Sequence, residues 1–139
     1  MSEEENHEQK PKGFTKAYRR AEKLIGSQQR LLSLLQKAIK KIDLKSATLK
    51  TAKDELLTLV RLVKAYVSGN YRDVALKTIL SAIAAIVYFV NPLDVLPDLL
   101  IGLGFMDDLT ILGYVLKRFQ GELDKFVEWE ISHADGDKT

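Results

Sequence analysis

One stretch of the chain, Thr78–Val90, contains no charged residue, and it constrains the fold more than any other feature. Its 13 residues read TILSAIAAIVYFV and include no proline or glycine. A helix that is apolar on every face lies either inside a protein core or in lipid. A membrane span needs about 20 such residues, whereas runs of about 10–14 are typical of a buried helix. We therefore predict that this segment is the central helix of a helical core.

Apolar residues elsewhere recur at intervals of three and four, and no alternating strand pattern or hairpin dipeptide occurs. This pattern predicts an all-α fold, an antiparallel helical bundle, because the connections between its periodic segments are short. We expect four long helices at about 14–42, 46–68, 71–90 and 107–131, and a short helix near 92–101.

Local signals set the expected ends of these helices. Gly26 does not change the phase of the first pattern, so we expect one continuous helix there despite a cost of about 1 kcal/mol. Ser46 is the expected N-cap of the second helix, and Gly69–Asn70 its end. Asn91 and Asp107 are expected to cap the helices that follow them.

The length of 139 residues suits one domain. We expect a disordered acidic tail over residues 1–12 and a single helical domain over 13–131. That domain divides into a basic helical hairpin, 13–68, and a second segment, 71–131. Residues 132–139 are polar and charged and are expected to form a second disordered tail.

The formal net charge of +2 conceals an uneven distribution. Residues 10–72 hold 16 Lys and Arg against 4 acids, whereas residues 73–139 hold 5 against 11. The basic half could face the acidic half of its own fold, remain a solvated surface, or contact anionic lipid or an acidic partner. Nucleic acid is the least favoured partner because no groove-reading motif accompanies the charge. The candidate lipid or partner surface is Lys16, Arg19, Arg20, Lys23, Lys37, Lys40 and Lys41.

Signals for enzymatic chemistry are missing from the sequence. It has no cysteine and therefore no thiolate nucleophile, and it lacks nucleophile-elbow, phosphate-loop and His-Glu-x-x-His motifs. We expect no catalytic residues and no cofactor, and so a non-enzymatic protein. The lack of cysteine and of an apolar leader favours a cytoplasmic location, at the inner membrane surface if the basic face binds lipid.

A distinctive motif follows the charge-free run: Asn91-Pro-Leu-Asp-Val-Leu-Pro-Asp98, then an apolar Gly-containing stretch that ends in Asp107-Asp108. This segment resembles the signature of the YkvA-like family, a bacterial domain of unknown function. The resemblance covers about residues 71–118. It implies a small helical domain that is often described as membrane-associated on the strength of hydropathy, and it implies no established activity. The matching positions are Asn91, Pro92, Asp94, Pro97, Asp98, Gly104, Asp107 and Asp108.

Four aspartates of this motif lie within 15 otherwise apolar residues: Asp94, Asp98, Asp107 and Asp108. Nearby carboxylates repel one another unless a cation or a proton intervenes. One interpretation is a divalent-cation site with oxygen ligands, of the Mg²⁺ or Ca²⁺ type. The favoured interpretation is that they cap helices and pair with the basic half.

The sequence thus favours a non-enzymatic interaction or scaffold module at the cytoplasmic membrane surface. The first alternative is a cation-binding or metal-dependent activity at the four aspartates. The second is an integral membrane hairpin formed by residues 74–90 and 99–116, in which Asp107 and Asp108 would lie mid-segment at high cost.

Overall fold

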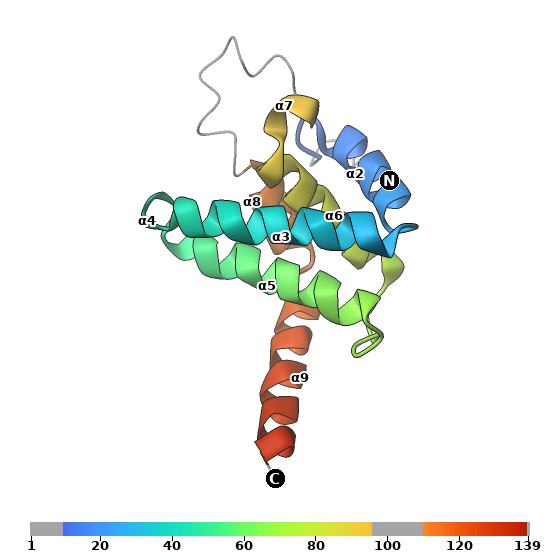
Figure 1. Cartoon of the computed structure of the whole chain (residues 1–139), viewed down its shortest axis with the longest axis vertical. Helices are drawn as coiled ribbons and strands as arrows, with labels where there is room; N and C mark the ends of the chain where they lie inside the picture. The colour runs from blue at the N-terminus through green and yellow to red at the C-terminus, as the bar shows by residue number, and fades with distance from the viewer. Residues whose placement is uncertain (1–9, 96–109, 139) are drawn as a thin grey trace.

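The computed structural model describes residues 10–95 and 110–138, and every regular element in these ranges is a helix (Figure 1). The all-α prediction is therefore confirmed for this part of the chain. The helices are α2 (Phe14–Leu24), α3 (Gln28–Leu44), α4 (Ser46–Leu49), α5 (Thr51–Val67), α6 (Leu76–Val90), α7 (Pro92–Val95), α8 (Thr110–Arg118) and α9 (Gln120–Lys138).

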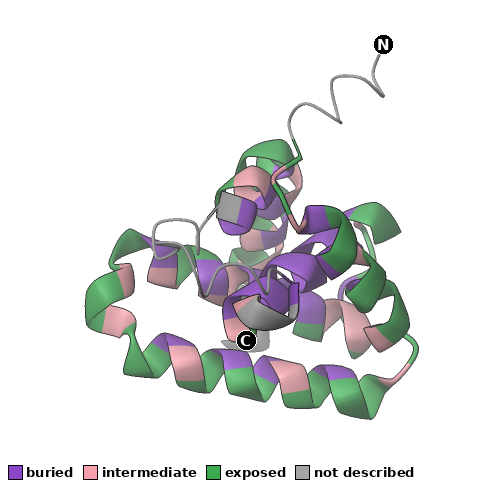
Figure 2. Cartoon of the chain, turned by 90° about the horizontal axis from the view of Figure 1, so that it is seen from above, coloured by how far each residue is buried: buried purple, intermediate pink, exposed green. Residues whose placement is uncertain are grey.

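The charge-free segment forms α6, in which all twelve residues from Thr78 to Phe89 are buried. Helices α2, α3, α5, α7 and α8 all pack against it. Figure 2 shows the buried residues gathered where these helices meet. Because no face of this segment carries a charge, every face can lose water without leaving a charge unpaired. Burial of α6 therefore organises the helices around it.

The first predicted helix, 14–42, is two helices in the structure, which makes that prediction wrong. Helix α2 ends at Leu24, and Ser27 adopts an extended conformation and caps α3 by accepting a hydrogen bond from the Arg30 N–H at 3.3 Å. Gly26 weakens the helix at this point, and the Ser27 hydroxyl satisfies a backbone donor of the new helix. The break allows α2 and α3 both to pack against α6.

Helix α3 is followed by a short return to α5, which lies beside α3 (Figure 1). Ser46 is not the cap of one helix over 46–68: it lies within the one-turn helix α4, whose N-cap position is Lys45. Lys50, with φ of 54°, then separates α4 from α5. The predicted end at Gly69–Asn70 is confirmed, because Gly69 has φ of 86° and the Asn70 N–H donates to the Ala65 carbonyl at 3.0 Å.

Two later helices also differ from the predicted boundaries. Helix α6 begins at Leu76 and not at 71, because residues 71–75 form a connection in which Tyr71 is buried. The predicted helix 107–131 appears as α8 and α9 over its described part, and α9 continues to Lys138 through residues that we expected to be a disordered tail. The ring of His133 contacts Trp129 with centroids 4.4 Å apart, which gives this continuation a side-chain contact.

Helix α9 projects from the body of the molecule and runs across the direction of α3 and α5 (Figure 1). The arrangement therefore differs from the predicted antiparallel bundle, in which the axes of all long helices run nearly parallel or antiparallel to one another. Several contacts attach the first half of α9, and two of them reach the start of α6 and the connection before it. The Thr78 hydroxyl at the start of α6 donates to the Glu122 carboxylate, and Tyr71 packs against Phe126 with ring centroids 5.1 Å apart.

Candidate functional site

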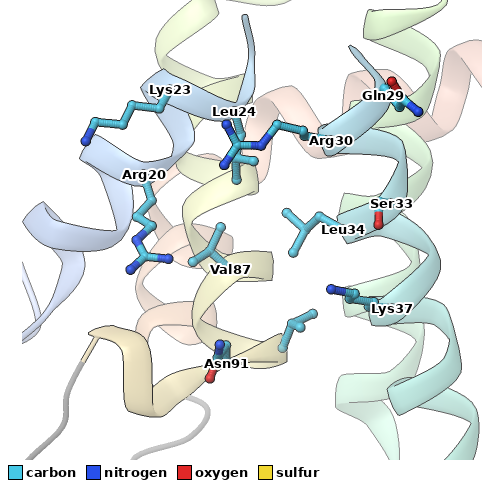
Figure 3. A pocket seen from close by; sticks show the side chains of 11 residues that line it. Arg20, Lys23, Leu24, Gln29, Arg30, Ser33, Leu34, Lys37, Val87 and Asn91 are labelled. Carbon is cyan, nitrogen blue, oxygen red and sulfur yellow. The ribbon is translucent and has the colours of Figure 1, made fainter. Parts of the chain in front are cut away.

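An open cleft of about 680 Å³ lies between α2, α3 and the C-terminal end of α6 (Figure 3). We call it the α2–α3 cleft. It exists because the chain turns at residues 25–27, so that the basic faces of α2 and α3 lie across from one another. Its lining residues are Arg20, Lys23, Leu24, Gln29, Arg30, Ser33, Leu34, Lys37, Val87, Val90 and Asn91.

Helical spacing explains which residues of α3 reach the cleft. Arg30, Leu34 and Lys37 are separated by four and three residues, so they share one face of the helix. Figure 3 shows the Arg30 and Lys37 side chains extending from α3 toward α2, with Leu34 between them. The face of α3 that enters the cleft therefore alternates cation, apolar residue and cation.

The end of α6 contributes Val87 and Val90 to the apolar lining of the cleft. A helix C-terminus carries a partial negative charge and would disfavour an anion. Here the Lys41 ammonium donates to the Phe89 carbonyl at 2.6 Å and lies 5.0 Å from the centroid of the Phe89 ring. Lys41 therefore offsets the negative end of α6 beside the cleft.

The charges that line the cleft are all positive. Arg20, Lys23, Arg30 and Lys37 contribute four formal charges, and no Asp or Glu lines it among the residues that the structure describes. Arg20 interacts elsewhere in the chain. Lys23, Arg30 and Lys37 form no ion pair with any described residue. The cleft is thus a concentrated positive field over an apolar floor, which suits an anionic ligand.

Where α5 packs against α9, basic residues are paired with acids. Arg61 of α5 holds Glu130 of α9 in a two-pronged contact, with nitrogen–oxygen distances of 2.8 and 3.2 Å. Lys125 pairs with Asp73 at 2.8 Å, and the hydrogen bond to the Asp73 carboxylate raises the pKa of the Lys125 ammonium. The interpretation in which the basic half faces the acidic half therefore holds for Arg61 but not for Lys23, Arg30 and Lys37 of the cleft.

The predicted basic surface is divided by the fold. The structure brings Arg20, Lys23 and Lys37 into the cleft. Arg19 lines a separate cavity of about 340 Å³ beside Glu22, and Lys41 is half-buried against Phe89. The two remaining residues, Lys16 and Lys40, are exposed and line neither cavity.

Sequence reasoning assigned no role in the site to the apolar floor, which consists of Leu24, Leu34, Val87 and Val90. It also left Arg30 out of the candidate surface. The signal for Arg30 was available, because it lies seven residues before Lys37 on the same helical face. No local signal placed Val87 and Val90 of α6 beside α3.

The predicted cation site lies almost entirely outside the described residues. Asp98, Asp107 and Asp108 fall in the range 96–109, and Asp94 is in α7 without a described side chain. Over residues 10–95 and 110–138, no group of three or more His, Asp or Glu side chains could hold a metal ion. The cation site at these aspartates stays a prediction, as do the caps formed by Asn91 and Asp107.

The integral hairpin required two membrane-spanning helices at 74–90 and 99–116, the second of which lies mostly outside the described residues. Within the ranges that the structure describes, no helix is both long enough and apolar enough to span a bilayer.

Comparison with known proteins identifies the family to which this helical chain belongs. Residues 78–114, which include most of α6 and the start of α8, match a family described as "Protein of unknown function (DUF1232)". The chain is also 34% identical over 91 residues to a Bacillus subtilis (strain 168) protein named "Uncharacterized membrane protein YkvA". That match covers 66% of this chain and 86% of the relative. The chain belongs to this YkvA-like family, and no solved structure matches it significantly.

Proposed function

We propose that this protein is a non-enzymatic interaction module that attaches to the anionic surface of a membrane through the basic residues of α2 and α3. The observation that carries the proposal is the α2–α3 cleft, where four cationic residues and no described acid surround apolar side chains. An ordinary solvated surface intersperses charges of both signs, as the contact of α5 with α9 does. The name of the Bacillus subtilis relative, which calls that protein a membrane protein, also supports this proposal.

The number of basic residues on α2 and α3 favours a membrane surface, and not a single acidic group, as the binding partner. Anionic lipid creates a negative potential, and each Lys or Arg close to it contributes about 1 kcal/mol of binding free energy. Lys16 and Lys40 are exposed on the same two helices and add to the field of the cleft. Because the cytoplasmic leaflet carries most anionic lipid, we propose that the module acts on the cytoplasmic side.

Flotation with vesicles tests the proposal. The full chain should float with phosphatidylcholine vesicles that contain phosphatidylglycerol, should not float with pure phosphatidylcholine, and should be released as NaCl screens the charges. Neutralising three cleft residues in Lys23→Gln/Arg30→Gln/Lys37→Gln should weaken binding about 100-fold, because about 3 kcal/mol is lost.

A matched control variant distinguishes the contribution of the cleft residues to vesicle affinity from that of the overall net charge. Lys45→Gln/Lys64→Gln/Lys117→Gln removes the same formal charge from exposed positions that do not line the cleft. We expect this variant to lose less than about tenfold in affinity. Equal losses in the two variants, or binding that pure phosphatidylcholine supports equally well, would contradict the proposal. Thermal unfolding of both variants checks that each remains folded.

A further inference from the structure

We infer that the α2–α3 cleft binds one phosphodiester lipid molecule, with its phosphate held by Arg30 and Lys37 and its glycerol and first acyl carbons on the apolar floor. This inference rests on the proposed function, because it concerns the same site. It goes further in one respect: a diffuse attraction to a charged surface needs no cavity and has no fixed stoichiometry, whereas this cleft would bind one ligand per chain.

The cleft has an amphipathic composition. Its floor combines Leu24 of α2, Leu34 of α3 and Val87 of α6, so three helices place apolar side chains beneath cationic ones. Leu24 and Leu34 are only partly buried against the core and keep surface toward the cleft. A ligand that is anionic at one end and apolar at the other satisfies both parts of this site, whereas free phosphate satisfies only the charges.

Two cationic side chains of α3 reach into the cleft. Arg30 lies four residues before Leu34 and Lys37 lies three residues after it, so both are about one helical turn from Leu34 on the same face of α3. Figure 3 shows both charged ends directed into the space between α2 and α3, whereas Lys23 extends outward. The guanidinium of Arg30 can donate two parallel hydrogen bonds to a phosphate, and Lys37 adds a point charge.

The helix ends at the cleft also affect its electrostatic field. Helix α3 begins beside the cleft, its first turn holds no acid, and Gln29 and Arg30 of that turn line the site. The N-terminus of a 17-residue helix contributes a partial positive charge there. Lys41 meanwhile offsets the negative end of α6 by its hydrogen bond to the Phe89 carbonyl. Both helix ends at the cleft are therefore compatible with a bound anion.

The cleft is larger than a phosphate ion requires. A volume of about 680 Å³ lies within the range of about 300–1,000 Å³ that is typical of sites for small organic ligands. A single phosphate ion would leave most of that volume to water over apolar side chains. A lipid headgroup with its glycerol and proximal acyl carbons would displace this water, which favours binding through the apolar surface it buries.

The test uses a short-chain lipid that remains monomeric. Dihexanoylphosphatidylglycerol, kept below its micelle concentration, is titrated into the full chain by calorimetry, and the methyl NMR signals of Leu34, Val87 and Val90 are followed. We expect saturation at one lipid per chain with shifts in these methyl groups. Glycerol 3-phosphate, which has the phosphate without the chains, should bind at least about tenfold more weakly. Dihexanoylphosphatidylcholine, which has no net charge, should also bind more weakly.

A pair of leucines on α3 provides a matched control. Leu34 lines the cleft, whereas Leu32 is exposed and lies about 200° away around the helix. Leu34→Gln should weaken binding of the short-chain lipid at least about tenfold, and Leu32→Gln should leave it unchanged. Val90→Thr, which keeps the shape of the side chain, provides a second variant of the floor in case Leu34→Gln unfolds.

The outcomes distinguish this inference from the proposed function. The chain could float with vesicles that contain phosphatidylglycerol while its binding of the short-chain lipid does not saturate, or is equal in Leu34→Gln and Leu32→Gln. That result overturns the single-lipid site and leaves the membrane module standing. Equal affinity for glycerol 3-phosphate overturns the lipid and assigns the cleft to free phosphate. Saturable short-chain binding without flotation overturns the membrane module and retains the lipid site.

Discussion

Basic residues occupy two different environments in this protein. Where α5 packs against α9, Arg61 contacts Glu130 through two short hydrogen bonds, and nearby Lys125 contacts Asp73. At the α2–α3 cleft, Lys23, Arg30 and Lys37 line one cavity together with apolar side chains, and none of the three pairs with a described acid. The first environment balances charge within the fold. The second accumulates one sign of charge, which costs stability through repulsion and favours an anionic partner.

The largest expected effect comes from reversing the charge of the cleft. Arg30→Glu/Lys37→Glu changes the local charge by four units, so the affinity for vesicles that contain phosphatidylglycerol should fall about 1,000-fold, or about 4 kcal/mol. Lys45→Glu/Lys64→Glu makes the same change in net charge outside the cleft and should lose far less. Flotation measures both. If the two variants lose affinity equally, the cleft has no special role and the comparison between the two environments fails.

A smaller effect is expected from the acidic residues that precede α2. Glu3, Glu4, Glu5 and Glu8 precede the first basic helix by a few residues in the sequence, so we expect their negative charges to reduce its net positive field. Changing all four to Gln should raise vesicle affinity up to about tenfold at low salt, and the gain should vanish in high salt. Flotation across a NaCl series measures this, and an unchanged affinity at low salt would show that these charges do not act on the cleft.

The break between α2 and α3 is expected to contribute to the free energy of unfolding. Ser27→Ala removes the hydroxyl that accepts from the Arg30 N–H and should lower the free energy of unfolding by about 1 kcal/mol. Urea denaturation measures this. Ser33→Ala on the same helix removes a hydroxyl from an exposed position and should change stability by less than about 0.5 kcal/mol. Equal effects in the two variants would show that Ser27 does not act as a cap.

The smallest effect is expected from the ion pair between Arg61 and Glu130. A double-mutant cycle with Arg61→Met and Glu130→Gln should give a coupling of about 0.5 kcal/mol, because both partners keep contact with solvent. Neither single variant should lose more than about threefold in vesicle affinity by flotation. A loss comparable to that of the cleft variants would place Arg61 in the membrane-binding surface and remove the distinction between the two environments.

Sequence reasoning succeeded where a local property was sufficient. The charge-free segment 78–90 predicted a buried helix, and Gly69–Asn70 predicted a helix end through the positive φ that glycine tolerates. It failed at residues 25–27, where the apolar pattern keeps its phase through a break. Periodicity indicates which residues face the core, but it does not indicate the direction of the helix axis. A turn after which the same apolar pattern continues therefore cannot be predicted from it.

The amino-acid sequence by itself determined that the chain is helical, that residues 78–89 must be removed from water, and that most of the basic residues precede them. Only the tertiary structure decided that Arg20 and Lys37 face one cleft, because in a straight helix they would lie about 25 Å apart along the axis. Packing of α2 and α3 on α6 fixed the turn between them and so set these residues across from each other. Such a contact depends on distances through space that residue spacing along the chain does not encode.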